Sequence, residues 1–418
     1  MEMFGDIDTI LYDIPFYQVI LPKTFTRGKN LRIDDLSDPV AHEMTHFYTS
    51  QLKRLYKAFD FEGFVESLND PTNLGMIPFY TGKFRRNSPN HYLIHPEEVF
   101  LFTMTKIATG WKNKAVVNMY FGAGVVKWSK AFPWALCYLD NRYRNILGYQ
   151  GMTRYVHKFP KYRLRIEQYV KKDMKRENPG VDNGYTVFPG LNRMPFNIIG
   201  FIDNTINKYS VPHSGPRGDY AGAARKVDYD DAQQAVYSGY KRLHGIKNET
   251  VYLANGMTFM FGPVSARRND RGVLQMSNLG PFLTQLQDGL FAAADGTEVK
   301  FGVFGDKAYN IADNDRVRSY YVETADGPPL TGDQIAVNRA MKSARMTIEK
   351  NYGMVSQIFK ICHQEGELKL AKSNAYACEQ LRVCHLLTNC YICLNGDQGS
   401  CSNMFDCRPP KLEDYLKL

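Results

Sequence analysis

The 418-residue sequence lacks the features of several protein classes. No stretch approaches the roughly 18–20 consecutive apolar residues of a membrane-spanning helix, so we expect no membrane partner. The first residues, MEMFGDIDTI, lack a basic segment followed by an apolar core, so we expect no signal peptide and an intracellular protein. Disordered, collagen-like and coiled-coil patterns are also missing. The composition, 44% hydrophobic and 23% charged, is typical of a folded chain of two or three domains.

Acidic residues are in the minority. There are 52 Lys and Arg residues against 43 Asp and Glu residues, which gives a net charge of +9. The excess is concentrated in one segment at 112–144 and in a second at 158–176, KFPKYRLRIEQYVKKDMKR. Clusters of like charge are typical of surfaces that bind nucleic acids. A solvated helix face would produce the same local pattern, so the clusters alone do not decide between the two interpretations.

The N-terminal part reads as all-α. Residues 1–95 predict a helical arm with long connections, and helical spacing is present at 35–60. Residues 96–150 predict three helices, of which the first begins at Pro96 and ends at Gly110. The tight Gly-containing turn before the third helix is typical of a helix-turn-helix DNA-binding region. A plain three-helix bundle is the alternative, and Pro133 inside the third helix favours it modestly.

If this region is a helix-turn-helix, three side chains in the early turns of the third helix would face DNA. They are Lys127, Ser129 and Lys130.

The C-terminal two-thirds predict an α/β fold. After a basic linker at 151–194, residues 195–360 contain in order a strand, a hairpin marked by an Asn-Gly pair, a helix at 273–289, a strand, and an amphipathic helix closed by Gly353. An insertion rich in Gly, Pro, Asn and Asp occupies about 206–236. This order predicts a ribonuclease-H-like core with a mixed sheet flanked by helices. Residues 361–418 form a Cys-rich segment of helices and tail.

Three acidic residues lie where this core could bring them together. Asp203 ends the apolar run NIIGFID, and Asp306 ends the run VKFGVFGD, so both are expected at the carboxyl edge of the sheet. Glu349 lies near the end of the amphipathic helix, on one stripe with Asn338, Lys342 and Arg345. Acids at strand ends are common, however, and Arg345 and Glu349 could form an ordinary surface pair.

Phosphodiester cleavage requires such a set of acids. Two divalent ions about 3.5–4 Å apart activate a water or a 3′-hydroxyl and stabilise the leaving oxygen. Three carboxylates suit hard ions that prefer oxygen ligands, so the expected cofactor is Mg²⁺ or Mn²⁺, as two ions.

The sequence motifs around these residues resemble the motifs of one protein family. GFIDNT, YSGYKRLHGIKNETVYLANG, GPVSARRND, FGDKAY and NRAMKSARMTIEKNYG are similar, in this order, to the DDE domain of Harbinger-type transposases. The segment HPEEVFLFTMTKIATG…YFGAGVVKWSKAF is similar to the helix-turn-helix region of that family. The resemblance covers about two-thirds of the chain.

The resemblance implies a metal-dependent DNA transposase or endonuclease whose catalytic and metal-binding acids are Asp203, Asp306 and Glu349. Asp270 matches a further acid of the family, which could be accessory to the site or could form a turn. Phosphate contacts are implied for the basic segment YSGYKRLHGIKN before the hairpin. Further DNA contacts are expected on the amphipathic helix. These residues are Tyr240, Lys241, His244, Lys247, Lys342 and Arg345.

Partners and localisation also follow from the resemblance. Family members cut element ends, join them to a short AT-rich target and work with a separate Myb-like DNA-binding protein that helps bring them to the nucleus. This chain has no Trp-repeat Myb pattern, since its three Trp residues all lie within 111–134. We therefore expect nuclear localisation with such a partner, or cytoplasmic localisation until the partner imports the protein. Whether the protein forms a homo-oligomer stays open.

The C-terminal cysteines allow two interpretations. Cys390 and Cys393 form a CxxC pair, and Cys401 and Cys407 follow, which would satisfy a four-coordinate zinc site. The apolar residues around them have helical spacing, however, and cysteine packs well as a small buried apolar residue.

Two other functions compete with an active transposase. A domesticated nuclear DNA-binding or adaptor protein could keep the fold and the acids without moving DNA. A different ribonuclease-H-like nuclease that acts on RNA would need no helix-turn-helix.

Overall fold

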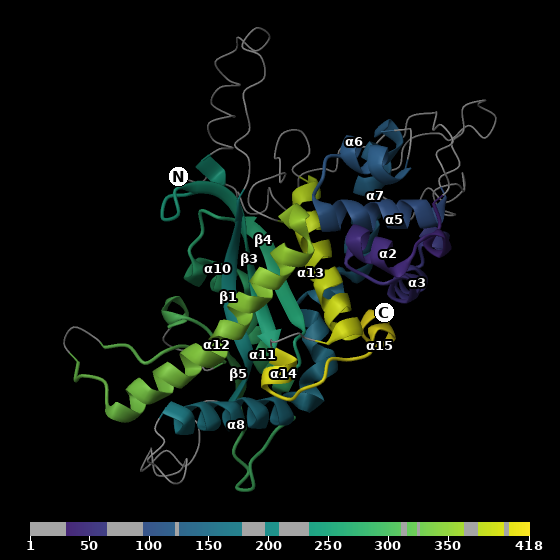
Figure 1. Cartoon of the computed structure of the whole chain (residues 1–418). Helices are drawn as coiled ribbons and strands as arrows, with labels where there is room; N and C mark the ends of the chain where they lie inside the picture. Colours follow the sequence, from purple (N-terminus) through teal and green to yellow (C-terminus); the bar gives the residue numbers. More distant parts are fainter. Residues whose placement is uncertain are drawn as a thin grey trace.

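The protein is described by a computed structural model (Figure 1). The described residues are 31–64, 95–121, 125–177, 197–208, 234–310, 316–323, 327–362, 375–396 and 401–418. Within these ranges no helix is both long and apolar enough to cross a bilayer. Most of the predicted N-terminal arm and residues 209–233 of the predicted insertion lie outside them.

A mixed sheet forms the centre of the fold. Its strands are β1 (Asn197–Lys208), β2 (Tyr237–Ser238), β3 (Leu243–Leu253), β4 (Thr258–Ser265), β5 (Phe301–Phe304) and β6 (Val317–Arg318). The order is β2-β3-β1-β5-β6, and β4 pairs with β3. β1 is antiparallel to β3 and parallel to β5, which is in turn parallel to β6. This mixed sheet is confirmed and is consistent with a ribonuclease-H-like core.

The hairpin predicted from the Asn-Gly pair is also confirmed. β3 and β4 are antiparallel and are joined at Asn255 and Gly256. Gly256 has a φ of 85° and donates its backbone N–H to the Leu253 carbonyl at 2.9 Å. A positive φ favours glycine, so the turn depends on this residue type.

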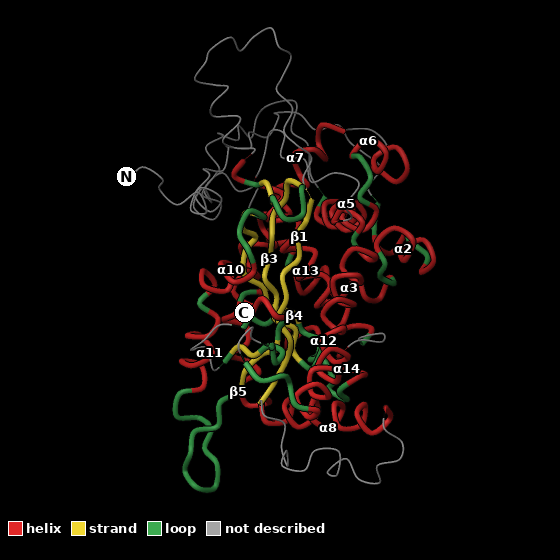
Figure 2. The backbone as a smooth tube through the Cα atoms, turned by 90° about the vertical axis from the view of Figure 1, so that its left-hand side faces the viewer, coloured by secondary structure: helices red, strands yellow, loops and turns green. Residues whose placement is uncertain are grey.

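Helices cover both faces of the sheet (Figure 2). α10 (Asp270–Ser277) and α11 (Leu279–Gln287) lie on one face, while α8 (Phe159–Glu177) and α12 (Gly332–Ile358) pack on the other, against β1. Short helices η4 (Lys307–Tyr309) and η5 (Lys360–Cys362) follow β5 and α12. The C-terminal part contains α13 (Ala375–Asn395), α14 (Cys401–Met404) and α15 (Leu412–Leu416).

Two helix predictions need correction. The single helix expected at 273–289 is two helices, because Asn278 between them adopts a left-handed backbone with φ of 51°. The amphipathic helix does not end at Gly353 but continues to Ile358. One interior glycine costs a helix only about 1 kcal/mol, and burial of Val355 and Phe359 beyond it favours the longer helix.

The all-α part lies beside the sheet (Figure 1). It contains η1 (Ile33–Asp35), α2 (Asp38–Thr45), α3 (Thr49–Phe59), α5 (Pro96–Thr109), α6 (Asn113–Val116), η2 (Val117–Phe121), α7 (Val125–Leu147) and η3 (Tyr149–Lys158). Aromatic packing joins its helices, as where Phe102 stacks on Trp128 with ring centroids 4.6 Å apart. α7 packs along α13 and also contacts β4, so this part shares its core with the sheet.

The helices of the predicted helix-turn-helix are present. α5 begins at Pro96 and ends before Gly110, whose φ is 64°, as predicted. α5, α6 and α7 contact one another, and α7 continues through Pro133. Residues 122–124, where the turn before the third helix is predicted, lie outside the described residues. The helix-turn-helix therefore stays a prediction.

The segment expected to be a basic linker is helical over most of its length. η3 and α8 account for residues 149–177, and α8 packs against β1. Tyr162, Ile166 and Val170 of this helix are buried, whereas Leu164 is exposed. Arg163 and Lys171 form ion pairs with the buried Glu167. The basic residues at 158–176 thus belong to a layer of the sheet domain.

Candidate active site

Asp203 and Asp306 lie at the same edge of the sheet because of how β1 and β5 pair. The parallel pairing ends with Phe201 opposite Phe304. Asp203 and Asp306 each follow two residues after that last pair. The negative charge of Asp306 raises the pKa of Asp203, as expected for neighbouring carboxylates.

The prediction that Asp203 ends its strand was wrong. β1 continues to Lys208, because the residues after Asp203 keep pairing with β3 as far as Lys208 opposite Gly245. The place where we expected the two acids is therefore set by the end of β5 and not by the end of β1. Asp203 lies on β1, two residues beyond the last residue that pairs with β5.

The Asp203 carboxyl group is largely buried, with 18% of the side chain exposed. Burial raises its pKa to about 6, and the nearby Arg345 guanidinium opposes this rise only in part. One carboxylate oxygen accepts the backbone N–H of Asn204 at 2.8 Å. The fold therefore holds a carboxylate where negative charge is incompletely compensated.

Arg345 on α12 connects Asp203 to Glu349. One guanidinium nitrogen donates to Asp203 Oδ2 at 2.8 Å, and another donates to Glu349 Oε1 at 2.5 Å. The Nε–H donates to the Tyr320 hydroxyl at 3.3 Å. Glu349 is half-exposed, one helical turn after Arg345. Two of the three predicted acids therefore meet at one guanidinium, and the third lies close to Asp203.

Two tyrosines, the buried Tyr309 and the partly buried Tyr352, hold the backbone around Asp203, and sequence reasoning did not identify them. The Tyr352 hydroxyl donates to the Asp203 carbonyl at 2.8 Å and also bonds the Thr250 hydroxyl. The Tyr309 hydroxyl accepts from the Asn204 side-chain amide at 2.6 Å. Burial raises the pKa of both tyrosines, so both keep their protons at neutral pH. Their positions in the motifs FGDKAY and EKNYG, beside Asp306 and Glu349, could have identified them in the sequence.

Asp270, the possible accessory acid, is held by Lys247. The Lys247 Nζ lies 2.9 Å from Asp270 Oδ1 and donates to the Arg268 carbonyl at 2.7 Å. The negative charge of Asp270 also raises the pKa of Asp203, so Asp270 is within electrostatic reach of the site. Lys247 itself is only 6% exposed. A phosphate contact by Lys247 would require this buried ion pair to open.

Several of the other residues predicted to contact DNA have exposed side chains. Tyr240 is 89% exposed, with the Lys241 ammonium 5.1 Å from its ring centroid. His244 is half-buried beside Tyr237, and Lys342 is exposed on α12. Ser129 is exposed on α7 and accepts from the Asn113 side chain at 3.0 Å. Lys127 and Lys130 lie in α7, but their side chains are outside the described part of the structure.

The donor set at the acids fits a hard divalent ion in its chemistry, since Asp203, Asp306 and Glu349 offer only oxygen ligands. In the described ranges, no group of three or more His, Cys, Asp or Glu side chains is assembled closely enough to hold a metal. At Asp203 and Glu349, a guanidinium supplies the positive charge that links the two carboxylates.

The C-terminal cysteines are mostly buried. Cys390 lies inside α13, Cys393 is partly buried on the same helix, and Cys407 is buried after α14. Burial raises the pKa of the Cys390 and Cys393 thiols, which disfavours the thiolate that zinc binds. The Cys401 side chain lies outside the described part. The buried cysteines fit the interpretation as small packing residues.

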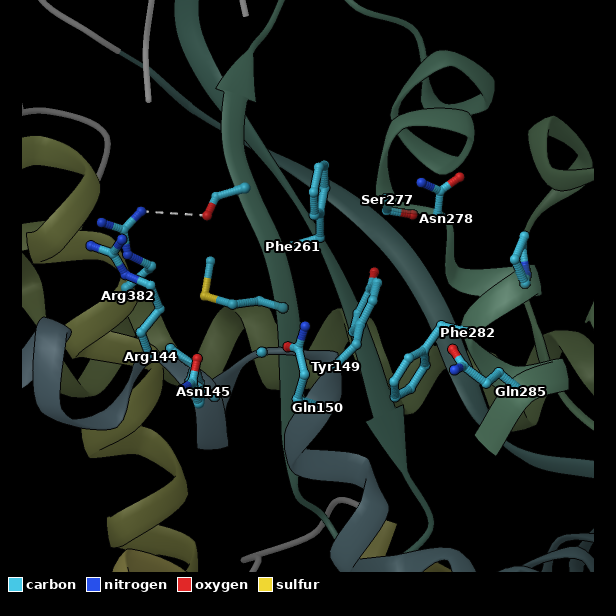
Figure 3. A pocket seen from close by; sticks show the side chains of 15 residues that line it. Arg144, Asn145, Tyr149, Gln150, Phe261, Ser277, Asn278, Phe282, Gln285 and Arg382 are labelled. Atoms are coloured by element: carbon cyan, nitrogen blue, oxygen red, sulfur yellow. Dashed lines mark hydrogen bonds between the residues drawn. The ribbon is translucent and has the colours of Figure 1, made fainter. Parts of the chain in front are cut away.

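A cavity of about 730 Å³ lies where the all-α part meets the sheet (Figure 3). Arg144 and Arg382 lie at one end, and the rest of the lining includes the rings of Tyr149, Phe261 and Phe282. None of the three acids lines this cavity. Its lining combines aromatic, basic and uncharged polar side chains and is separate from the three acids.

Comparison with known proteins finds similarity to a protein family. Residues 223–389 match the family model of the DDE superfamily endonucleases. The match includes Asp270, Asp306 and Glu349 and begins after Asp203. Comparisons with curated proteins and with solved structures find no match. The family match supports a DDE transposase-like domain with nuclease function in this chain.

Proposed function

We propose that the protein is a Harbinger-type DNA transposase that binds transposon ends and cleaves and rejoins phosphodiester bonds by two-metal-ion catalysis. The observation that carries the proposal is the meeting of three elements at one edge of the sheet. β1 supplies Asp203, the end of β5 supplies Asp306, and α12 supplies Glu349. The DDE superfamily match supports the same chemistry.

Asp203, Asp306 and Glu349 would hold two Mg²⁺ or Mn²⁺ ions. When bound, such ions activate the attacking oxygen and stabilise the leaving oxygen. The burial of Asp203 favours this assignment, because its raised pKa indicates negative charge that a cation would compensate.

The chain's own residues would position DNA around the acids. Tyr352 and Tyr309 fix the Asp203 backbone and so restrict where its carboxylate lies. Lys342 and Arg345 on α12 would face the phosphates near the acids. The exposed turn with Tyr240 and Lys241 would contact DNA further along β3, with His244 beside it.

The helices at 96–150 would bind element ends through Lys127, Ser129 and Lys130. A separate Myb-like protein would deliver the transposase to DNA in the nucleus, where an AT-rich target receives the element.

Cleavage of an end-containing DNA by three variants tests the proposal. Asp203→Asn, Asp306→Asn and Glu349→Gln should each abolish nicking in Mg²⁺ or Mn²⁺ while leaving DNA binding largely intact. Asp288→Asn, an exposed acid after α11, is the matched control and should cleave normally. Near wild-type cleavage by any triad variant removes that residue from the site. No cleavage by the wild-type protein, with correct ends and a Myb-like partner, would favour the domesticated adaptor.

A further inference from the structure

The contacts of Arg345 have a consequence that rests on the proposed metal-dependent function. We infer that Arg345 is an internal cation that links the acids in the DNA-free protein and competes with divalent ions until DNA phosphate draws it away. Asp203 and Glu349 are the acceptors, and Arg345 is their shared donor.

The guanidinium is well placed for this role. It uses separate nitrogens for Asp203 and Glu349, and its own side chain is only 15% exposed. Without it, Asp203 would face the negative charges of Asp306 and Asp270, since no other basic side chain in the described ranges forms an ion pair with it. Arg345 therefore does in the DNA-free protein part of what a bound cation would do.

The fold also fixes Arg345 from the other side. Its Nε–H contacts the Tyr320 hydroxyl, and the Tyr320 ring packs edge-on against Phe304 of β5 at 5.0 Å. The next residue, Tyr321, exchanges two backbone hydrogen bonds with the Asn338 side chain of α12, at 2.9 and 2.8 Å. The guanidinium is thus held between the acids and a segment tied to its own helix.

This geometry makes Arg345 and a metal ion compete for the same carboxylates. Asp203 and Glu349 would hold a divalent ion with carboxylate groups whose oxygens already accept from Arg345, and the two positive charges would repel each other strongly. The ion therefore binds well only if Arg345 leaves those oxygens. A DNA phosphate offers a guanidinium an alternative bidentate partner. DNA binding and metal binding should then strengthen each other, and such coupling is reciprocal.

The test measures Mn²⁺ binding to the full-length protein without DNA. Calorimetry and the shift in thermal stability both report the binding. Arg345→Gln should bind Mn²⁺ on the order of tenfold more tightly than wild type, because a charge close to the acids is removed. Arg345→Lys keeps the charge but cannot bridge two carboxylates with a planar fork, so its affinity should lie between the two. Lys350→Gln removes an exposed charge next to Glu349 and is the matched control, with affinity near wild type. An oligonucleotide carrying the element end should tighten Mn²⁺ binding to wild type, but much less to Arg345→Gln.

The outcomes separate this inference from the proposed function. Mn²⁺ binding by wild type that is lost in Asp203→Asn supports the metal site. Equal or weaker binding by a folded Arg345→Gln then overturns the inference alone, because Arg345 would be helping rather than competing. If wild type and both Arg345 variants bind no Mn²⁺, with or without DNA, the proposed metal site fails and the inference fails with it. Arg345→Lys keeps the test valid if Arg345→Gln does not fold.

Discussion

Glu249 offers a quantitative test of how the sheet is packed around the candidate site. It lies on β3, is fully buried, and accepts a hydrogen bond from the Tyr149 hydroxyl at 2.7 Å. Burial raises the pKa of Glu249 from 4.5 to about 7, although hydrogen bonds from Ser277 and Tyr149 oppose the rise. The perturbation is Glu249→Gln, which keeps the shape and an acceptor for Tyr149 but removes the ionisation.

The sign of the effect follows from proton binding. In the unfolded chain Glu249 loses its proton near 4.5, whereas in the folded protein it keeps it until about 7. Between these values the folded state binds more protons, so the free energy of unfolding falls as pH rises. The full loss is about 3 kcal/mol and is complete above the folded pKa. Glu249→Gln should therefore match wild type near about pH 4.5 and be up to about 3 kcal/mol more stable near about pH 8.5.

Urea unfolding across this pH range, at constant ionic strength, measures the difference between the two proteins. Other buried acids also titrate here, including Asp203 and Glu379, so the difference between variants is the informative quantity. The exposed Glu323→Gln is the control and should follow wild type within about 0.5 kcal/mol. A stability difference for Glu249→Gln that does not change with pH would refute the reasoning.

Three further predictions concern DNA binding, the acid site and the core. Lys127→Ala with Lys130→Ala should lower the slope of log DNA affinity against log salt by somewhat under one unit per lost phosphate contact, and an unchanged slope would favour the plain three-helix bundle. Tyr352→Phe removes the donor to the Asp203 carbonyl and should slow cleavage roughly fivefold or more at unchanged DNA affinity; wild-type rates would show that this bond does not position Asp203. Asn389→Ala breaks hydrogen bonds to both backbone groups of Thr258, and denaturant unfolding should show a loss of about 2–4 kcal/mol; a loss below about 1 kcal/mol would contradict the role of this buried contact.

Local chemistry explains which parts of the fold the sequence by itself determined. Pro96 and Gly110 bound α5 because proline suits a first helical turn and glycine suits a left-handed residue at its end. Asn255 and Gly256 determine the hairpin for a similar reason. The i,i+4 spacing of Arg345 and Glu349 also predicts their contact, since it places them on one helix face.

Only the tertiary structure decided how the acids meet and which basic residues are exposed. Asp203 and Arg345 lie 142 positions apart, and they touch because α12 packs on β1. β1 runs past Asp203 because β3 continues to pair with it, which no local signal in NIIGFID specifies. Lys247 looks like a surface residue in the sequence, but burial of β3 directs it to Asp270. Long-range pairing and burial are properties of the assembled sheet, so neither can be read from a single segment.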